Sequence, residues 1–138
     1  MMYIYYQRTG HLLHSTTGQD TLVATGYSGF GEARNDPVSE RRPGLGPIPR
    51  GAYLIGDESK DETHGPVAIH LLPLTGTETF GRSGFLVHGD SISAPGAASH
   101  GCIVVPRKVR ESMADGGDRL LVVLSGNEVL APATPSIT

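Results

Sequence analysis

Short apolar segments, interrupted at close intervals by glycine and proline, are the feature of this sequence that most limits its fold. The 138-residue chain contains 19 glycines and 10 prolines, and its apolar runs are only a few residues long. This composition favours short strands joined by turns, because glycine and proline weaken the interior of a helix. The sequence therefore predicts an all-β or mainly β fold.

The expected strands share aromatic, β-branched and aliphatic residues and are bounded by turn residues. They cover residues 3–7, 11–15, 21–26, 51–56, 66–72, 85–87, 103–105 and 119–125. Residues 106–114 predict one helix, since Pro106 suits a first helical turn and Val109 and Met113 lie four apart on one face. Residues 27–50 lack periodicity, so we expect a long ordered loop there, with a disordered insertion as the alternative.

Three histidines outside the most informative motif receive structural interpretations. His11 and His14 lie on opposite faces of one predicted strand, and we expect both to be solvated at an edge. His70 interrupts the apolar segment 66–72, where a structural histidine is expected rather than a catalytic one.

Length, charge and cysteine content exclude several classes of protein. We expect a single domain over residues 1–125 and a loose tail over residues 126–138. A net charge of −3 without a basic run argues against nucleic-acid binding. The apolar runs fall well short of the roughly 18 residues of a membrane span. A single cysteine cannot form an internal disulfide.

That cysteine, Cys102, lies in the segment with the clearest chemical pattern. It follows His100 and Gly101, and His88 ends the apolar run 85–87 upstream. A thiol is a strong nucleophile as its thiolate, and a nearby imidazole can take the proton, so both histidines are candidate partners and we expect a lowered thiol pKa. The connection 89–98 is rich in Gly, Ser, Ala and Pro, which predicts two adjacent strands joined by a surface loop.

Glycine next to the candidate nucleophile supports the same chemistry. Gly101 allows a sharp backbone turn that directs N–H groups at a substrate oxygen, as an oxyanion hole requires. The pattern His88-Gly89, then Ser99-His100-Gly101-Cys102-Ile103, resembles the signature of the L,D-transpeptidase catalytic domain, the YkuD-type cysteine enzymes that act on bacterial peptidoglycan.

Further matches resemble the branch of that family containing type VI secretion effectors that attack the cell wall. They are Gly26-Tyr27-Ser28-Gly29, Asn35-Asp36-Pro37 and the segment from Gly46 to Tyr53, and the resemblance extends over residues 3–124. It implies a barrel-like or sandwich-like β domain with a short helix after the cysteine. One departure is Val104, where many cell-wall transpeptidases carry the arginine two positions after the cysteine.

The resemblance also implies a reaction and its site residues. The substrate would be a peptidoglycan stem tetrapeptide, cleaved before its terminal D-alanine, with Cys102 as nucleophile and His88 as acid and base. The Gly89 carbonyl would orient the His88 ring, the backbone N–H groups of His100, Gly101 and Cys102 would hold the oxyanion, and Ser99 would shape the turn. Water would give L,D-carboxypeptidase activity, whereas an amine would give exchange or a cross-link. No cofactor is implied.

The resemblance further implies partners and a place of action. The polar residues 1–10 do not have the pattern of a signal peptide, so we expect synthesis in the cytoplasm, transport by a secretion system and action in the periplasm of a target bacterium. An immunity protein and a secretion-system component are the expected protein partners.

Two alternatives remain open at this point. His88, Asp90, His100 and Cys102 provide four potential ligands for zinc, which would make the protein a metal-dependent hydrolase. A non-catalytic module is the other alternative, in which the loop 27–50 binds the cell wall and the cysteine is incidental.

Overall fold

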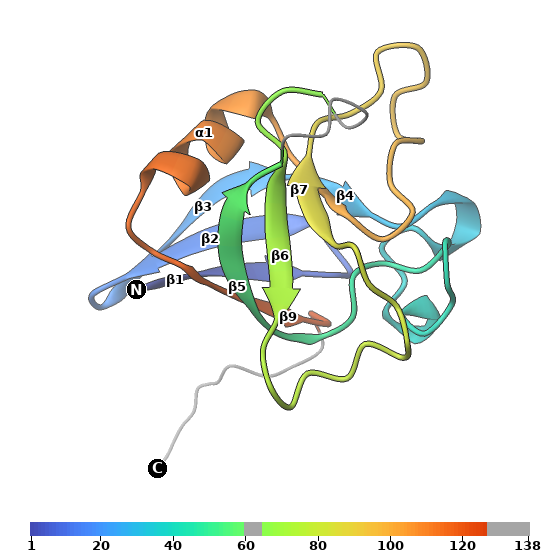
Figure 1. The fold of residues 1–138 in the computed structure, drawn as a ribbon, viewed down its shortest axis with the longest axis horizontal. Helices are drawn as coiled ribbons and strands as arrows, with labels where there is room; N and C mark the ends of the chain where they lie inside the picture. The colour runs from blue at the N-terminus through green and yellow to red at the C-terminus, as the bar shows by residue number, and fades with distance from the viewer. Residues whose placement is uncertain (60–64, 127–138) are drawn as a thin grey trace.

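The computed structural model describes residues 1–59 and 65–126, and it consists mainly of one curved β-sheet (Figure 1). The sheet has nine strands in the order β3-β2-β1-β9-β5-β6-β7-β8-β4 and forms a nearly closed, barrel-like structure. The mainly β fold with one short helix is confirmed. The tail predicted over residues 126–138 lies outside the described residues from position 127 onward.

The strands are β1 (Met2–Tyr6), β2 (His11–Thr16), β3 (Gln19–Thr25), β4 (Tyr27–Ser28), β5 (Gly51–Glu58), β6 (Ile69–Pro73), β7 (Leu86–His88), β8 (Ile103–Val104) and β9 (Leu120–Leu124). Most match the predicted segments within a few residues. Strand β3 begins two residues early, at Gln19, because the tight turn at Thr17 and Gly18 already reverses the chain. Strand β6 begins three residues late, at Ile69, because Pro66 and Val67 form a turn in which Val67 has a φ of +57°.

Alternation along the strands builds the core inside the curved sheet. Tyr53 and Ile55 on β5 are buried, whereas Leu54 between them is 40% exposed. Leu121 and Val123 on β9 follow the same period of two and belong to the same apolar cluster. Successive side chains of a strand point to opposite faces, so each strand contributes every second residue to this core.

Strand β9 lies in the middle of the sheet although it is the last strand in the sequence. It pairs in parallel with β1 on one side and antiparallel with β5 on the other. Leu121 lies opposite Tyr3 of β1 and opposite Tyr53 of β5. The first and the last strand of the described chain are therefore neighbours in the sheet.

The strands that flank the candidate site, β7 and β8, are parallel neighbours. Val87 pairs with Ile103 and His88 with Val104, while β4 joins the outer side of β8. The prediction that the segments around His88 and Cys102 are adjacent strands is confirmed. The loop between them projects from the top of the molecule in Figure 1.

Helix α1 (Arg107–Asp115) follows β8 and packs near β5 and β7 at one end of the sheet (Figure 1). Pro106 is its N-cap, as the missing N–H of proline allows, and Gly116 is its C-cap. Met113 is buried in the core cluster and Val109 packs against that cluster. The predicted apolar face of the helix is thus confirmed. The helix itself begins and ends one residue later than predicted.

The loop 27–50 is ordered, as predicted, through short turns and side-chain bonds. It contains β4 and the 3₁₀ turns η1 (Gly31–Ala33) and η2 (Pro37–Ser39). Asp36 accepts a hydrogen bond from the Val38 N–H, and Glu40 forms a 2.9 Å ion pair with Arg50. Both contacts lie within the loop. Gln7, which follows β1, attaches the loop to the sheet by donating to the Glu40 carboxylate at 3.0 Å and to the Ile48 carbonyl at 2.8 Å.

The edge position predicted for His11 and His14 is wrong. Strand β2 has neighbours on both sides, so neither His11 nor His14 lies on an edge strand. The Nε2 atom of His14 lies 2.7 Å from a carboxylate oxygen of Asp118, and its ring stacks on Tyr3 at a centroid distance of 4.4 Å. His70, which is expected to be structural rather than catalytic, is exposed on β6. Over residues 1–59 and 65–126, no helix has both the length and the apolar character that crossing a membrane requires.

Candidate active site

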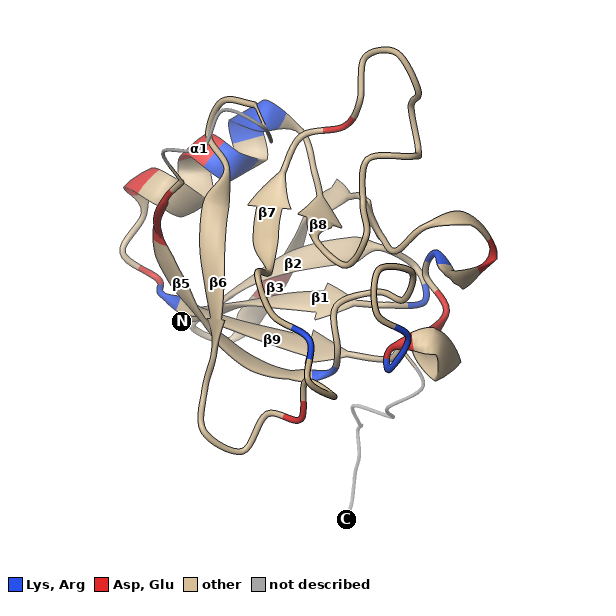
Figure 2. Cartoon of the chain, turned by 45° about the vertical axis from the view of Figure 1, so that its right-hand side comes forward, with Lys and Arg blue, Asp and Glu red and all other residues tan. Residues whose placement is uncertain are grey.

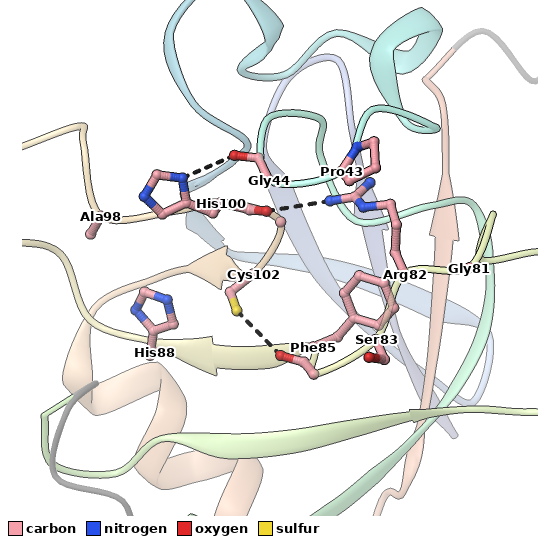
Figure 3. A pocket seen from close by; sticks show the side chains of 12 residues that line it. Pro43, Gly44, Gly81, Arg82, Ser83, Phe85, His88, Ala98, His100 and Cys102 are labelled. Atoms are coloured by element: carbon pink, nitrogen blue, oxygen red, sulfur yellow. Dashed lines mark hydrogen bonds between the residues drawn. The ribbon is translucent and has the colours of Figure 1, made fainter.

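A pocket of about 370 Å³ opens beside the turn that precedes β8 (Figure 3). The side chains of His88, His100 and Cys102 all line it, together with Arg82 and Phe85. The remaining lining residues come from the turn 43–44, the segment 81–84 and positions 98 and 101. The structure therefore brings the predicted cysteine and both candidate histidines to one cavity.

Strand alternation explains why His88 and Cys102 share that cavity. Val87 and Ile103 are paired across the two strands and both belong to the buried core. His88 and Cys102 each adjoin one of these core residues in the sequence, so their side chains point to the opposite face. Figure 3 shows the His88 ring and the Cys102 sulfur pointing into the same pocket.

The His88 ring is oriented by a backbone carbonyl. Its Nδ1 atom lies 2.7 Å from the Gly89 carbonyl oxygen, and the side chain is buried. A carbonyl oxygen only accepts hydrogen bonds, so this contact places the proton on Nδ1 and leaves Nε2 as the basic nitrogen. The carbonyl after the histidine thus contacts the ring as the sequence comparison implied.

The Cys102 thiol is half-buried and donates a weak hydrogen bond to the Gly84 carbonyl at 3.9 Å. Burial raises the pKa of the Cys102 thiol, although the Leu86 N–H and the positive charge of Arg82 act in the opposite direction. The expected lowering of the thiol pKa is therefore not found. Desolvation of the thiolate is the reason, and the thiol form predominates at neutral pH.

Ser99 organises the turn between the two candidate residues. Its buried hydroxyl donates to the Cys102 carbonyl at 2.5 Å and accepts from the N–H groups of Gly29 at 3.0 Å and Gly101 at 3.2 Å. The expected role of Ser99 in shaping this turn has a direct structural basis. The Gly101 N–H, which was expected to hold the oxyanion, is bonded to the Ser99 hydroxyl.

A comparison with family models gives a match over residues 22–120, the segment that contains His88, Ser99 and Cys102, to the Tlde1 domain. The chain belongs to the Tlde1 domain family. Tlde1 domains are found in type VI secretion effectors that target peptidoglycan, which agrees with the effector branch indicated by the sequence. A search among curated proteins gave no match.

His100, the other candidate partner of Cys102 in this Tlde1 domain, has a different environment from His88. The Nδ1 atom of His100 donates to the Gly44 carbonyl at 2.9 Å, and its ring stacks on Phe30 at a centroid distance of 5.0 Å. Both contacts attach the turn before Cys102 to the loop 27–50. His100 therefore holds the pocket wall, while His88 presents a basic nitrogen to the pocket.

The four residues weighed as zinc ligands do not converge. Asp90 accepts hydrogen bonds from the Tyr27 hydroxyl at 2.5 Å and from the Gly96 N–H at 3.1 Å, outside the pocket that holds Cys102. Across the described part of the chain, no group of three or more His, Cys, Asp or Glu side chains is placed to hold a metal ion. The geometry gives no support to the zinc alternative.

Gly101 and Gly89 are required by close contacts as well as by chemistry. Gly101 has a φ of +137°, and a Cβ atom there would lie 2.4 Å from Nη2 of Arg82. A Cβ atom at Gly89 would lie 2.8 Å from Nη2 of Arg110. Two buried arginines therefore pack directly against the backbone on either side of the site.

Sequence reasoning did not identify Arg82. It lies between the predicted strands 66–72 and 85–87, and its neighbours in sequence carry no motif. Its partners belong to residues 40–47 and to His100, so no local pattern indicates the contact.

Charges around the site are mixed in sign. Figure 2 shows basic and acidic residues interspersed on α1 and on the loops at the right of the view. The helix itself carries Arg107 and Glu111 as an ion pair with a distance of 3.2 Å. This distribution gives no concentrated cationic face for nucleic acid in that view.

Proposed function

We propose that this Tlde1 domain is a cysteine acyl transferase that acts on the stem tetrapeptides of peptidoglycan. The observation that carries the proposal is the arrangement of His88 and Cys102, in one pocket on neighbouring strands, with Nδ1 of His88 bound to the Gly89 carbonyl so that Nε2 is the basic nitrogen of the ring. This is the arrangement that a thiol nucleophile and its acid-base partner need.

The reaction begins with Cys102 as a thiol, because burial raises its pKa. As the sulfur attacks the carbonyl carbon before the terminal D-alanine, Nε2 of His88 takes the thiol proton and a carbon–sulfur bond forms. The tetrahedral intermediate collapses, the amide carbon–nitrogen bond breaks, and His88 returns the proton to the leaving amine. The product of this half-reaction is a thioester on Cys102 and free D-alanine.

Backbone groups stabilise the negative oxygen of the tetrahedral intermediate in this proposal. The Gly101 N–H is already bonded to the Ser99 hydroxyl. We therefore assign the oxyanion to the N–H groups of His100 and Cys102, on either side of Gly101. Ser99 keeps the turn in the shape that presents them.

The second half-reaction consumes the thioester. His88 removes a proton from an incoming water or amine as the new bond to the acyl carbon forms. The carbon–sulfur bond then breaks, and His88 returns the proton to the departing sulfur, which regenerates the thiol and the neutral imidazole. Water gives a shortened stem peptide, a D-amino acid gives an exchanged one, and a second stem peptide gives a cross-link.

Mass spectrometry of purified muropeptides incubated with the protein tests this function. Wild-type protein is expected to remove or exchange the terminal D-alanine, and Cys102→Ala is expected to abolish the mass change. His88→Ala should lower turnover by roughly a hundred- to ten-thousand-fold. His70→Ala, in which an exposed histidine outside the pocket is changed, is the matched control and should retain activity.

Retained activity in Cys102→Ala would contradict the thiol mechanism. Retained activity in His88→Ala, with activity lost in His100→Ala, would transfer the acid-base role to His100. A protein that binds peptidoglycan without changing any muropeptide mass would support the alternative of a non-catalytic wall-binding module.

A further inference from the structure

Arg82 is buried beside the pocket and bonds to backbone carbonyls from two separate segments. Nη1 donates to the carbonyls of Glu40 and Pro47, the latter at 2.8 Å. Nη2 donates to the Gly46 carbonyl at 2.9 Å and to the His100 carbonyl at 3.4 Å. The side chain is only 8% exposed, so the loop 40–47 and the turn before Cys102 are joined through one guanidinium.

The charge of Arg82 is not matched by an ion pair. Its four hydrogen-bond acceptors are neutral carbonyls, and within residues 1–59 and 65–126 it takes part in no salt bridge. The carboxylate of Glu40 is bound by Arg50 and by Gln7 instead. A buried cation without a carboxylate partner exerts its field on whatever lies next to it, since little water screens it.

The residues next to that cation are Gly101 and Cys102. The guanidinium approaches Gly101 so closely that a Cβ atom there would lie 2.4 Å from Nη2. The Arg82 and Cys102 side chains line the same pocket, as Figure 3 shows. Charge coupling acts in both directions, because the positive charge of Arg82 opposes the rise in the pKa of the Cys102 thiol that burial causes.

We propose that Arg82 is a positioning residue for Cys102: it fixes the backbone of the turn through the His100 carbonyl, and it keeps a positive charge without a carboxylate partner in the wall of the pocket that holds the sulfur. This inference rests on the proposed function, in which Cys102 is the nucleophile. Because its Nη atoms bind carbonyls, Arg82 does not act as a clamp for a substrate carboxylate. Its charge favours the thiolate that forms as His88 accepts the proton.

Two substitutions separate the charge of Arg82 from its geometry. Arg82→Lys keeps the charge but cannot bond to four carbonyls, whereas Arg82→Met loses both. We expect alkylation of Cys102 by iodoacetamide at pH 7 to slow by about tenfold in Arg82→Met and to change little in Arg82→Lys. Muropeptide turnover should fall in both variants, because the turn loses its support.

Arg41→Met is the matched control. Arg41 is exposed and lies over the Phe80 ring at 5.0 Å, much as Arg82 lies over the Phe85 ring at 5.7 Å. The Arg41→Met substitution should leave both the alkylation rate of Cys102 and muropeptide turnover unchanged. Circular dichroism and thermal melting establish that each variant is folded, and an unchanged alkylation rate in folded Arg82→Met would overturn the inference.

A measurement on the wild-type protein keeps the inference testable if the Arg82 variants do not fold. Iodoacetate is an anion and iodoacetamide is neutral, so the ratio of their rates reports the potential at the sulfur. We expect this ratio to exceed that of N-acetylcysteinamide, a thiol without a charged group beside it, and a ratio equal to or below it would overturn the inference. Neither reagent involves peptidoglycan, so this result is independent of whether Cys102→Ala abolishes muropeptide turnover.

Discussion

At the scale of single residues, the hydroxyl of Ser99 shows how a small polar group determines the shape of a site. It is fully buried and joins three backbone groups, the Cys102 carbonyl and the N–H groups of Gly29 and Gly101. A buried polar group that loses its partner costs about 1–3 kcal/mol. Ser99 thus satisfies groups that the sharp turn would otherwise leave unpaired.

Replacing Ser99 by alanine is therefore expected to lower the free energy of unfolding by about 2–4 kcal/mol, since several buried backbone groups lose their partner together. Urea denaturation measures this change. Ser93→Ala is the control, because Ser93 is exposed in the loop 89–98 and its hydroxyl lies 3.3 Å from that of Ser91. Equal stability of the two variants would show that the Ser99 hydroxyl does not support the turn.

At the scale of elements, the loop 89–98 is fastened at its base and free at its tip. The Tyr27 hydroxyl donates to Asp90 at 2.5 Å and accepts from the Ala98 N–H at 2.9 Å, so it joins both ends of the loop. Ile92 at the tip is fully exposed. The two ends of the loop, after β7 and before β8, are thereby held together while the tip projects into solvent.

The Tyr27 contact also changes the titration of Asp90. Burial alone would raise the pKa of the Asp90 carboxyl, but hydrogen bonds from the Tyr27 hydroxyl and the Gly96 and Ser91 N–H groups outweigh it and hold the pKa below its usual range. A carboxyl whose pKa is lowered by folding stabilises the fold above its ordinary pKa. That contribution is lost as the pH falls through the lowered value.

Tyr27→Phe is expected to move the pKa of Asp90 upward, toward its ordinary value, and to speed hydrogen exchange at the Ala98 amide. NMR titration of the Asp90 carboxyl and amide exchange measure the two effects. The amide of Gly26, which donates to the Gly10 carbonyl at 2.8 Å, serves as an internal reference and should be unchanged. If exchange at Ala98 were unchanged as well, the base of the loop would not depend on Tyr27.

At the scale of the whole molecule, the position of β9 determines when the fold can form. Strand β9 lies between β1 and β5, and Leu121 pairs with residues of both. The sheet therefore cannot close until the chain has been made as far as β9. Pairing across such a sequence separation carries a loop-closure cost that local hairpins avoid.

The molecule as a whole belongs to a family of effectors that target peptidoglycan, and its toxicity should depend on compartment. Wild-type protein made in a bacterial cytoplasm is expected to be tolerated, because peptidoglycan lies outside the cytoplasmic membrane. The same protein fused to a periplasmic signal peptide should cause swelling, lysis or division defects, scored by growth and microscopy. Cys102→Ala in the periplasm is the control and should be harmless.

Equal toxicity from both compartments would indicate a target other than the cell wall. Equal toxicity of the wild type and Cys102→Ala in the periplasm would show that the thiol is not responsible for the effect. An immunity protein stays a predicted partner, for which co-expression in the periplasm is the corresponding assay.

The sequence by itself determined the features that depend on neighbouring residues. Short β-rich segments bounded by turn residues predicted most of the strands, and Pro106 predicted the beginning of the helix. The Gly-rich connection between two apolar runs predicted that His88 and Cys102 lie on adjacent strands. These features were predictable because side-chain period, turn chemistry and short connections act over a few residues.

Only the tertiary structure decided the features that depend on distant residues. The central place of β9, the pairing of His14 with Asp118 and the carbonyl contacts of Arg82 join segments far apart in the sequence. The raised pKa of Cys102 likewise depends on how deeply the surrounding residues enclose the sulfur. Local pattern carries no record of strand order or desolvation, because both arise when the sheet closes around its core.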